Sequence, residues 1–176
     1  FDYLLYLRDT LKEDAKNGGK LISHIYDRHK YFLIDEFQDT NPMQAEVFFY
    51  LTAQNPQEDW YKCVPYPGSL FIVGDPKQSI YRFRLANPKN FIEVMETSEK
   101  YTEDSNCENK AILLNKNFRS SPQVIDFVNY IFGCLMTKNC GEIDYTDDEK
   151  LYFGAKQYNN GKDDSRLTCI NFIDSN

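Results

Sequence analysis

The sequence predicts an α/β fold built on a parallel sheet with flanking helices. Three short apolar runs, at residues 31–34, 70–73 and 111–114, each end abruptly in polar residues. Continuous runs without alternation are typical of strands that are covered on both faces, as in a parallel sheet. A helix signal follows each run, so strand, polar turn and helix recur three times along the chain.

Each of these three helices is predicted to begin at a capping residue followed by proline, which suits the first helical position. The starts lie at residues 41–42, 87–88 and 121–122, and Gln44 is placed to complete a capping box at the first. The apolar stripe over residues 124–135 is the clearest amphipathic pattern in the chain. A further helix is expected near the N-terminus, ending at residues 17–19 (Asn-Gly-Gly).

At 176 residues and 20.7 kDa the chain has room for one ordinary domain or two incomplete ones. The stretch 97–110 is polar and acidic without an apolar period, so we place a boundary there and expect domains at 1–105 and 106–176. Residues 54–69 are expected to form a loop. Residues 142–166 are polar, and 167–173 are expected to close as a strand.

Composition narrows the class of protein. The hydrophobic fraction of 41%, with 13 Phe and 13 Tyr, excludes a disordered tail, and no apolar run is long enough to span a membrane. The net charge of −7 argues against binding nucleic acid over the whole surface. Five scattered cysteines without a C-x-x-C pair favour a reducing cytoplasm, and the missing initiator Met and basic leader predict an internal fragment.

Acidic residues follow the first apolar run directly, as Asp35 and Glu36. Ligands of open α/β sheets bind beyond the carboxyl ends of the strands. Asp35 is therefore a candidate ligand of Mg²⁺, and Glu36 a candidate base that polarises an attacking water. The alternative is a solvated turn that leads into a capped helix.

Basic and aromatic residues alternate after the second run. From Asp75 to Lys89 there are four basic residues and one acidic residue, a local +3 in a chain of net −7. Aromatic rings beside arginines are typical of surfaces that stack the bases of single strands. Tyr81 and Phe83 are expected to share one face of an extended segment. The alternative is that these apolar side chains are simply core.

After the third run, Arg119 lies between a strand and a helix start, where a planar guanidinium suits phosphate oxygens. A surface arginine beside a helix cap is the alternative interpretation.

Taken together, these blocks resemble those of superfamily 1A (UvrD/RecB-like) DNA helicases. Residues 35–40 resemble motif II (Walker B), residues 74–86 motif III and residues 113–121 motif IV, in the family's order. The resemblance implies part of a RecA-like (P-loop NTPase) domain followed by the start of a second one. Within the superfamily the chain is most similar to the AddA-type component of AddAB/RexAB helicase-nucleases, on Arg84-Leu85-Ala86 and on residues 141–145.

The resemblance implies a role for each matching residue. Asp35 would hold Mg²⁺, Glu36 would be the general base, and Gln78 would sense the γ-phosphate of ATP. Arg119 would act as an arginine finger, and Phe118 would lie against the adenine.

It further implies that Tyr81, Phe83 and Arg84 contact single-stranded DNA. The substrates implied are single-stranded and double-stranded DNA, unwound with hydrolysis of Mg-ATP in double-strand-break repair and recombination. A second component of the AddB/RexB type is the implied partner, the implied location is the cytoplasm, and no membrane is involved.

No G-x-x-x-x-G-K-[ST] sequence occurs in the 176 residues, so the Walker A element is expected to lie outside this chain. The chain alone is therefore expected neither to hydrolyse ATP nor to unwind DNA. Two alternatives stay open: a non-catalytic module that binds single-stranded DNA or a partner, and a Mg-dependent nuclease that uses Asp35, Glu36 and Asp75 with Lys77 nearby.

Overall fold

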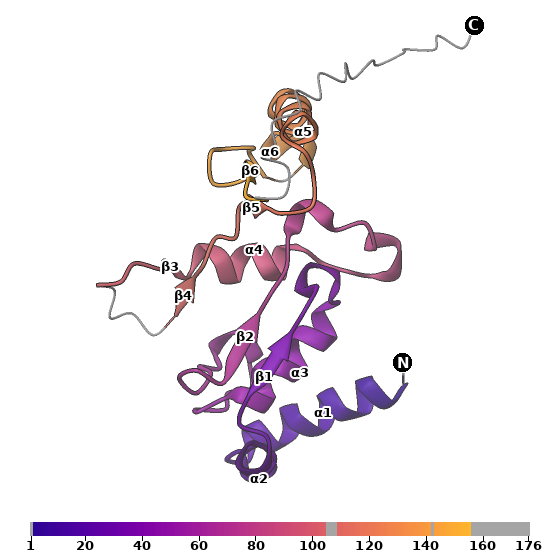
Figure 1. Ribbon diagram of the computed structural model, residues 1–176. Coiled ribbons are helices and arrows are strands. Elements are labelled where there is room, and N and C mark those ends of the chain that lie inside the picture. Colours follow the sequence, from indigo (N-terminus) through magenta and orange to yellow (C-terminus); the bar gives the residue numbers. More distant parts are fainter. Residues whose placement is uncertain (1, 105–108, 142, 156–176) are drawn as a thin grey trace, which may run out of the picture. The chain divides into compact units, whose positions relative to one another are not determined.

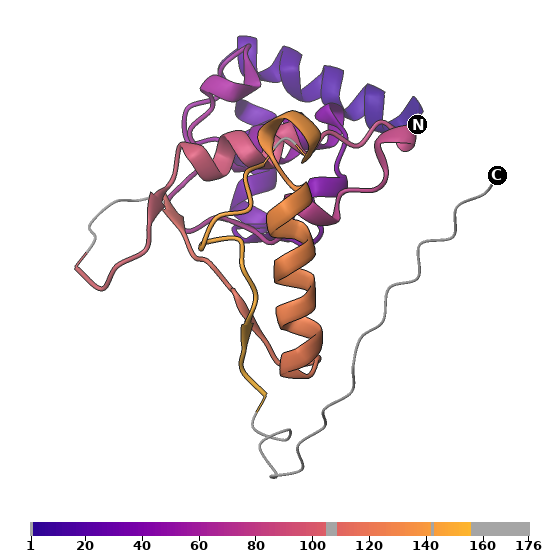
Figure 2. The same cartoon turned by 90° about the horizontal axis from the view of Figure 1, so that it is seen from above.

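The computed structural model describes residues 2–104, 109–141 and 143–155 (Figures 1 and 2). The chain divides into two compact units, one up to Ile112 and one from Leu113 onward, which we describe separately. Among the described residues, no helix has the length and apolar character needed to cross a bilayer.

The first unit mixes helices with short strands. Its helices are α1 (Asp2–Lys16), α2 (Lys20–Arg28), α3 (Pro42–Thr52) and α4 (Lys89–Glu96), and its strands are β1 (Phe32–Ile34), β2 (Leu70–Ile72), β3 (Glu99–Lys100) and β4 (Lys110–Ala111). Single 3-10 turns lie at η1 (Phe37–Asp39), η2 (Trp60–Lys62), η3 (Pro76–Gln78) and η4 (Arg82–Arg84). The second unit contains β5 (Lys116–Asn117), α5 (Pro122–Leu135), α6 (Lys138–Gly141) and β6 (Tyr152–Phe153).

The described strands form three separate parallel pairs, β1–β2, β3–β4 and β5–β6. The first pair confirms two predicted strands, whereas the third apolar run does not join their sheet. Only Ala111 of that run lies in a strand, and Ile112 and Leu114 are exposed. The partner of β4 is β3, which is closer along the chain than β2 and lies in the stretch that we expected to be a break; a short connection favours such pairing.

Helices cover one face of the β1–β2 pair, so the prediction of strands covered on both faces is wrong for the described residues. Ile34 and Ile72 pack against a buried cluster that α3 and α4 share with Phe37. On the opposite face Leu33 is 76% exposed and Phe71 54% exposed, because successive side chains of a strand point to opposite faces.

The predicted helix starts are confirmed at two positions and shifted at the third. At α3 the Asn41 side chain accepts the N–H of Gln44 (2.9 Å), and the Gln44 side chain accepts the N–H of Asn41 (2.9 Å), which completes the capping box. Helix α5 begins at Pro122, as predicted. Helix α4 begins one residue later than predicted, because Pro88 occupies the N-cap.

A second cluster joins α1, α2 and α3. Leu11 and Ile22 are fully buried and Tyr50 is 1% exposed. The Tyr50 hydroxyl donates to the carbonyl of Glu58 (2.7 Å), and burial raises the pKa of Tyr50 to about 12, so it remains a donor at neutral pH. Figure 1 shows the three helices together at the N-terminal end of the chain.

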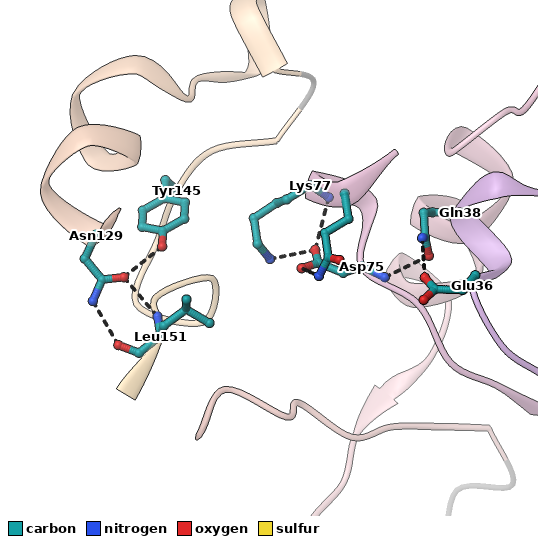
Figure 3. A network of polar contacts seen from close by, with 8 residues as sticks. Glu36, Gln38, Asp75, Lys77, Asn129, Tyr145 and Leu151 are labelled. Carbon is teal, nitrogen blue, oxygen red and sulfur yellow. Dashed lines mark hydrogen bonds and ion pairs between the residues drawn. The ribbon is translucent and has the colours of Figure 1, made fainter. Parts of the chain in front are cut away.

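In the second unit, Asn129 of α5 ties the helix to the segment before β6. Its amide donates to the carbonyl of Leu151 (2.8 Å) and accepts from the Tyr145 hydroxyl (2.8 Å) and the Leu151 N–H (3.0 Å) (Figure 3). Of the predicted apolar stripe on α5 only Ile125 is buried, and Leu135 is 65% exposed. Strand β6 lies in a stretch that we expected to be polar, and the expected strand at 167–173 lies outside the described residues.

We expect Leu11→Ala to lower the free energy of unfolding of the first unit by about 2–5 kcal/mol, because it removes a fully buried side chain. The matched control is Leu5→Ala on the same helix, where the side chain is 37% exposed and the loss is about 1 kcal/mol or less. Urea unfolding followed by the fluorescence of Trp60, the single tryptophan, measures both. Equal losses in the two variants would contradict the packing described for α1.

Candidate functional site

The acidic pair lies on the turn that leaves β1. Asp35 and Glu36 are both exposed, and an Asp35 carboxylate oxygen accepts the N–H of Glu36 (2.9 Å). Glu36 has a φ of 52°, in the left-handed region that non-glycine residues rarely adopt. Backbone strain of this kind persists only where the surroundings enforce it, and it gathers at functional sites.

Gln38 supplies one such constraint. Its side chain is 1% exposed, and its amide nitrogen donates to the Glu36 carboxylate (2.7 Å). Its amide oxygen accepts the N–H of Asp75 (3.0 Å), which lies on the turn that leaves β2 (Figure 3). One buried amide therefore holds together the two loops that leave the paired strands.

Asp75 organises the second loop. One of its carboxylate oxygens accepts the N–H of Lys77 (3.0 Å) and pairs with the Lys77 ammonium (2.9 Å). The other accepts the side-chain amide of Gln78 (2.9 Å). The exposed Gln78, expected to sense a phosphate, is therefore turned toward Asp75 in this structure.

The residues present suit Mg²⁺ in a limited way. Mg²⁺ usually keeps several waters and takes one or two protein carboxylates, and the exposed carboxylate of Asp35 at the end of a strand fits that pattern. The nuclease alternative requires more ligands. Among the described residues no three His, Cys, Asp or Glu side chains gather as a metal site, so Asp35, Glu36 and Asp75 do not form one.

Tyr81, Phe83 and Arg84 form a compact group on η4, which we call the aromatic triad. The rings of Tyr81 and Phe83 lie 5.9 Å apart, and the Arg84 guanidinium lies 5.5 Å from the first ring centre and 5.6 Å from the second. Phe83 is 76% exposed, so the alternative that it is core is wrong. The segment is a 3-10 turn and not extended as predicted, because the N–H of Arg84 bonds back to the carbonyl of Tyr81 (2.8 Å).

Leu85 ends this turn in a left-handed conformation, with a φ of 68°. This is the backbone region that favours glycine. Its side chain is 63% exposed, so packing compensates little for the strain.

In the second unit, Asn117 positions the segment that carries Phe118 and Arg119. The Asn117 side chain accepts the N–H groups of Arg119 (2.9 Å) and Ser120 (2.8 Å). Residues Lys116 to Arg119 line an open hollow of about 590 Å³. The Phe118 ring is 61% exposed and lies against Gly154, where a Cβ would approach the ring to 2.8 Å.

The structure thus brings Asp35 and Glu36 together in one loop, Tyr81, Phe83 and Arg84 together in one turn, and Phe118 and Arg119 together in the second unit. Sequence reasoning missed Gln38 and Asn117, which position these groups. An amide between two carboxylates in residues 35–40 was an available signal for Gln38, because a strand end rarely concentrates so many polar groups.

Residues 1–99 match the UvrD/REP helicase N-terminal domain. The match covers more than half of the chain, and the chain belongs to this helicase family.

Relatives named as the A-type component of an ATP-dependent helicase/nuclease are similar over most of the chain. The protein of Thermoanaerobacter pseudethanolicus is 40% identical over 153 residues, 87% of this chain and 11% of its own length. That of Clostridium acetobutylicum is 41% identical over 131 residues, 74% of this chain and 10% of its own length. That of Pediococcus pentosaceus is 36% identical over 146 residues, 83% and 11% respectively. The chain spans about a tenth of the length of these relatives.

At position 85 we expect the usual order of alanine and glycine to be reversed. Leu85→Gly should be more stable than Leu85→Ala by about 1 kcal/mol, because only glycine adopts a positive φ without strain. At Leu7 in α1 the order is the ordinary one, with alanine ahead by about 1 kcal/mol. Urea unfolding monitored at Trp60 compares the four variants, and alanine ahead of glycine at both positions would contradict the left-handed turn.

Proposed function

We propose that this chain is the part of an ATP-driven DNA helicase, of the AddA (helicase/nuclease) type, that carries the general base and one DNA contact. The observation that carries the proposal is the link between two loops. The acidic pair after β1 is held by Gln38 to the loop after β2, and that loop continues into the aromatic triad. Family membership and the names of the relatives support the motor assignment.

On this proposal Asp35 holds the Mg²⁺ that accompanies ATP, and the ion neutralises phosphate charge when it is bound. Glu36 orients the attacking water and accepts its proton, so its carboxylate must be ionised and correctly aimed. Gln38 aims it by donating to one carboxylate oxygen. Gln78 would have to leave Asp75 before its amide meets a phosphate oxygen.

The aromatic triad offers stacking surfaces for bases, and Arg84 and Arg82 offer positive charge for the DNA backbone. Single-stranded DNA is the substrate that this combination fits. Translocation along one strand would then unwind double-stranded DNA ahead of it.

We further propose that residues 1–105 and 106–176 belong to two successive RecA-like motor domains. Phe118 would lie against the adenine and Arg119 would reach the γ-phosphate from the second domain, with Asn117 fixing their turn. Motifs II, III and IV would then be residues 35–40, 74–86 and 113–121, with the Walker A element, ATP cradle and AddB/RexB-type partner contributed outside these 176 residues. The chain alone would then lack ATPase activity.

A second candidate function is a non-catalytic module that binds single-stranded DNA. The exposed aromatic triad favours it, since that group needs no nucleotide to stack bases. The strained Glu36 held by a buried amide favours the motor, because a binding module has no use for an aimed carboxylate.

Glu36→Gln separates these two functions in the longer protein of which we propose this chain to be a part. We expect DNA-stimulated ATP hydrolysis to fall by at least about 100-fold, because an amide does not accept the proton. Affinity for single-stranded DNA should be unchanged. Steady-state ATPase assays and fluorescence anisotropy measure the two; hydrolysis at the wild-type rate would favour the binding module.

Phe83→Ala tests the DNA contact in the same longer protein. Loss of one stacked base should weaken binding of an oligothymidine by about 5- to 100-fold, the equivalent of about 1–3 kcal/mol. Tyr61→Ala is the matched control, since Tyr61 is 67% exposed in the same unit but lies outside the aromatic triad. Anisotropy titrations in which the two variants bind equally well would exclude stacking at Phe83.

A further inference from the structure

Gln38 stands out as a buried polar residue with two long-range duties. Its side chain is 1% exposed, and its two amide atoms face opposite ways, one toward Glu36 and one toward Asp75. Its backbone carbonyl also accepts from the hydroxyl of Ser79 (3.4 Å), four residues beyond Asp75. Figure 3 shows this residue between the two loops.

We propose that Gln38 is a positioning residue that couples the DNA-contacting loop to the aim of Glu36. The inference rests on the proposed function. When the loop that carries Asp75 and leads to the aromatic triad shifts, the Asp75 N–H moves, and the amide that accepts from it moves with it. The opposite end of the same rigid, planar amide holds the carboxylate that would activate water.

Hydrogen-bond chemistry fixes the direction of this amide. The Asp75 N–H can only donate and an ionised Glu36 carboxylate can only accept. Only one orientation of the Gln38 amide satisfies both, with the oxygen toward Asp75 (3.0 Å) and the nitrogen toward Glu36 (2.7 Å). No other uncharged side chain of similar length provides an acceptor and a donor in this arrangement, so glutamine is specifically suited to the position.

Gly74 leaves room for the link. A Cβ at this position would lie 2.6 Å from the Gln38 amide oxygen and 3.3 Å from the backbone nitrogen of Phe37. Gly74→Ala would therefore push the amide away from the Asp75 N–H. It supplies a second way to break the link without altering Gln38.

The first experiment measures the link itself in the 176-residue chain, by hydrogen exchange of the Asp75 amide with NMR detection. Gln38→Met, which keeps the length but removes donor and acceptor, should expose that amide to exchange, as should Gly74→Ala. Gln38→Glu keeps an acceptor and should leave it protected. Gln44→Met is the matched control, because Gln44 also bonds a backbone N–H but in the α3 capping box.

The second experiment measures coupling in the longer protein. Gln38→Met and Gly74→Ala should reduce the stimulation of kcat for ATP hydrolysis by single-stranded DNA by about tenfold, which corresponds to about 1.4 kcal/mol. The KM for ATP and the affinity for DNA should not change. Gln38→Glu should lose stimulation too, since it cannot donate to Glu36, whereas Gln44→Met should keep it.

The outcomes separate the two proposals. If Glu36→Gln abolishes hydrolysis but Gln38→Met retains wild-type stimulation, the coupling is wrong and the motor stands. Wild-type exchange of the Asp75 amide in Gln38→Met also overturns the coupling. If Glu36→Gln hydrolyses ATP normally, the proposed function fails, and the coupling that rests on it fails as well. A rise in KM alone would show a role in ATP binding and not in coupling.

Discussion

The parallel pairing of β1 with β2 is the constraint on which the candidate site depends. With Phe32 opposite Leu70 and Ile34 opposite Ile72, both strands end at the same edge. The pairing continues one step past the strands, where Val73 donates to the Ile34 carbonyl (2.8 Å) and Phe37 donates to the Val73 carbonyl (3.0 Å). Because these bonds fix the two loops side by side, a single amide can bridge them.

The strained backbone at Glu36 is tolerated because its neighbour is anchored on several sides. Phe37 is fully buried between α3 and α4, and its ring lies 6.1 Å from that of Phe91. Gln38 adds hydrogen bonds to both loops. Side-chain burial after Glu36 therefore sets the conformation before it, and the exposed acidic group is oriented by residues that never meet solvent.

Much of this arrangement followed from sequence pattern. Two apolar runs, the capping box at Asn41 and the abrupt change to acidic residues predicted β1, β2, α3 and the acidic loop, because those signals are local. The β3–β4 pair and the open face at Leu33 were missed, since pairing partners and coverage depend on contacts remote in sequence. The role of Gln38 was missed for the same reason: its bond partner Asp75 lies 37 residues away.

The cluster of α1, α2 and α3 has a consequence for synthesis on the ribosome. All of its buried members, from Leu11 to Cys63, precede the first residue of β2. A chain made from its N-terminus onward can therefore pack this cluster before Leu70 has been added. Strand β1 would meanwhile wait with its hydrogen-bonding edge unpaired, so the order of translation favours a stable helical base first and leaves the bridged loops as the last part of the unit to assemble.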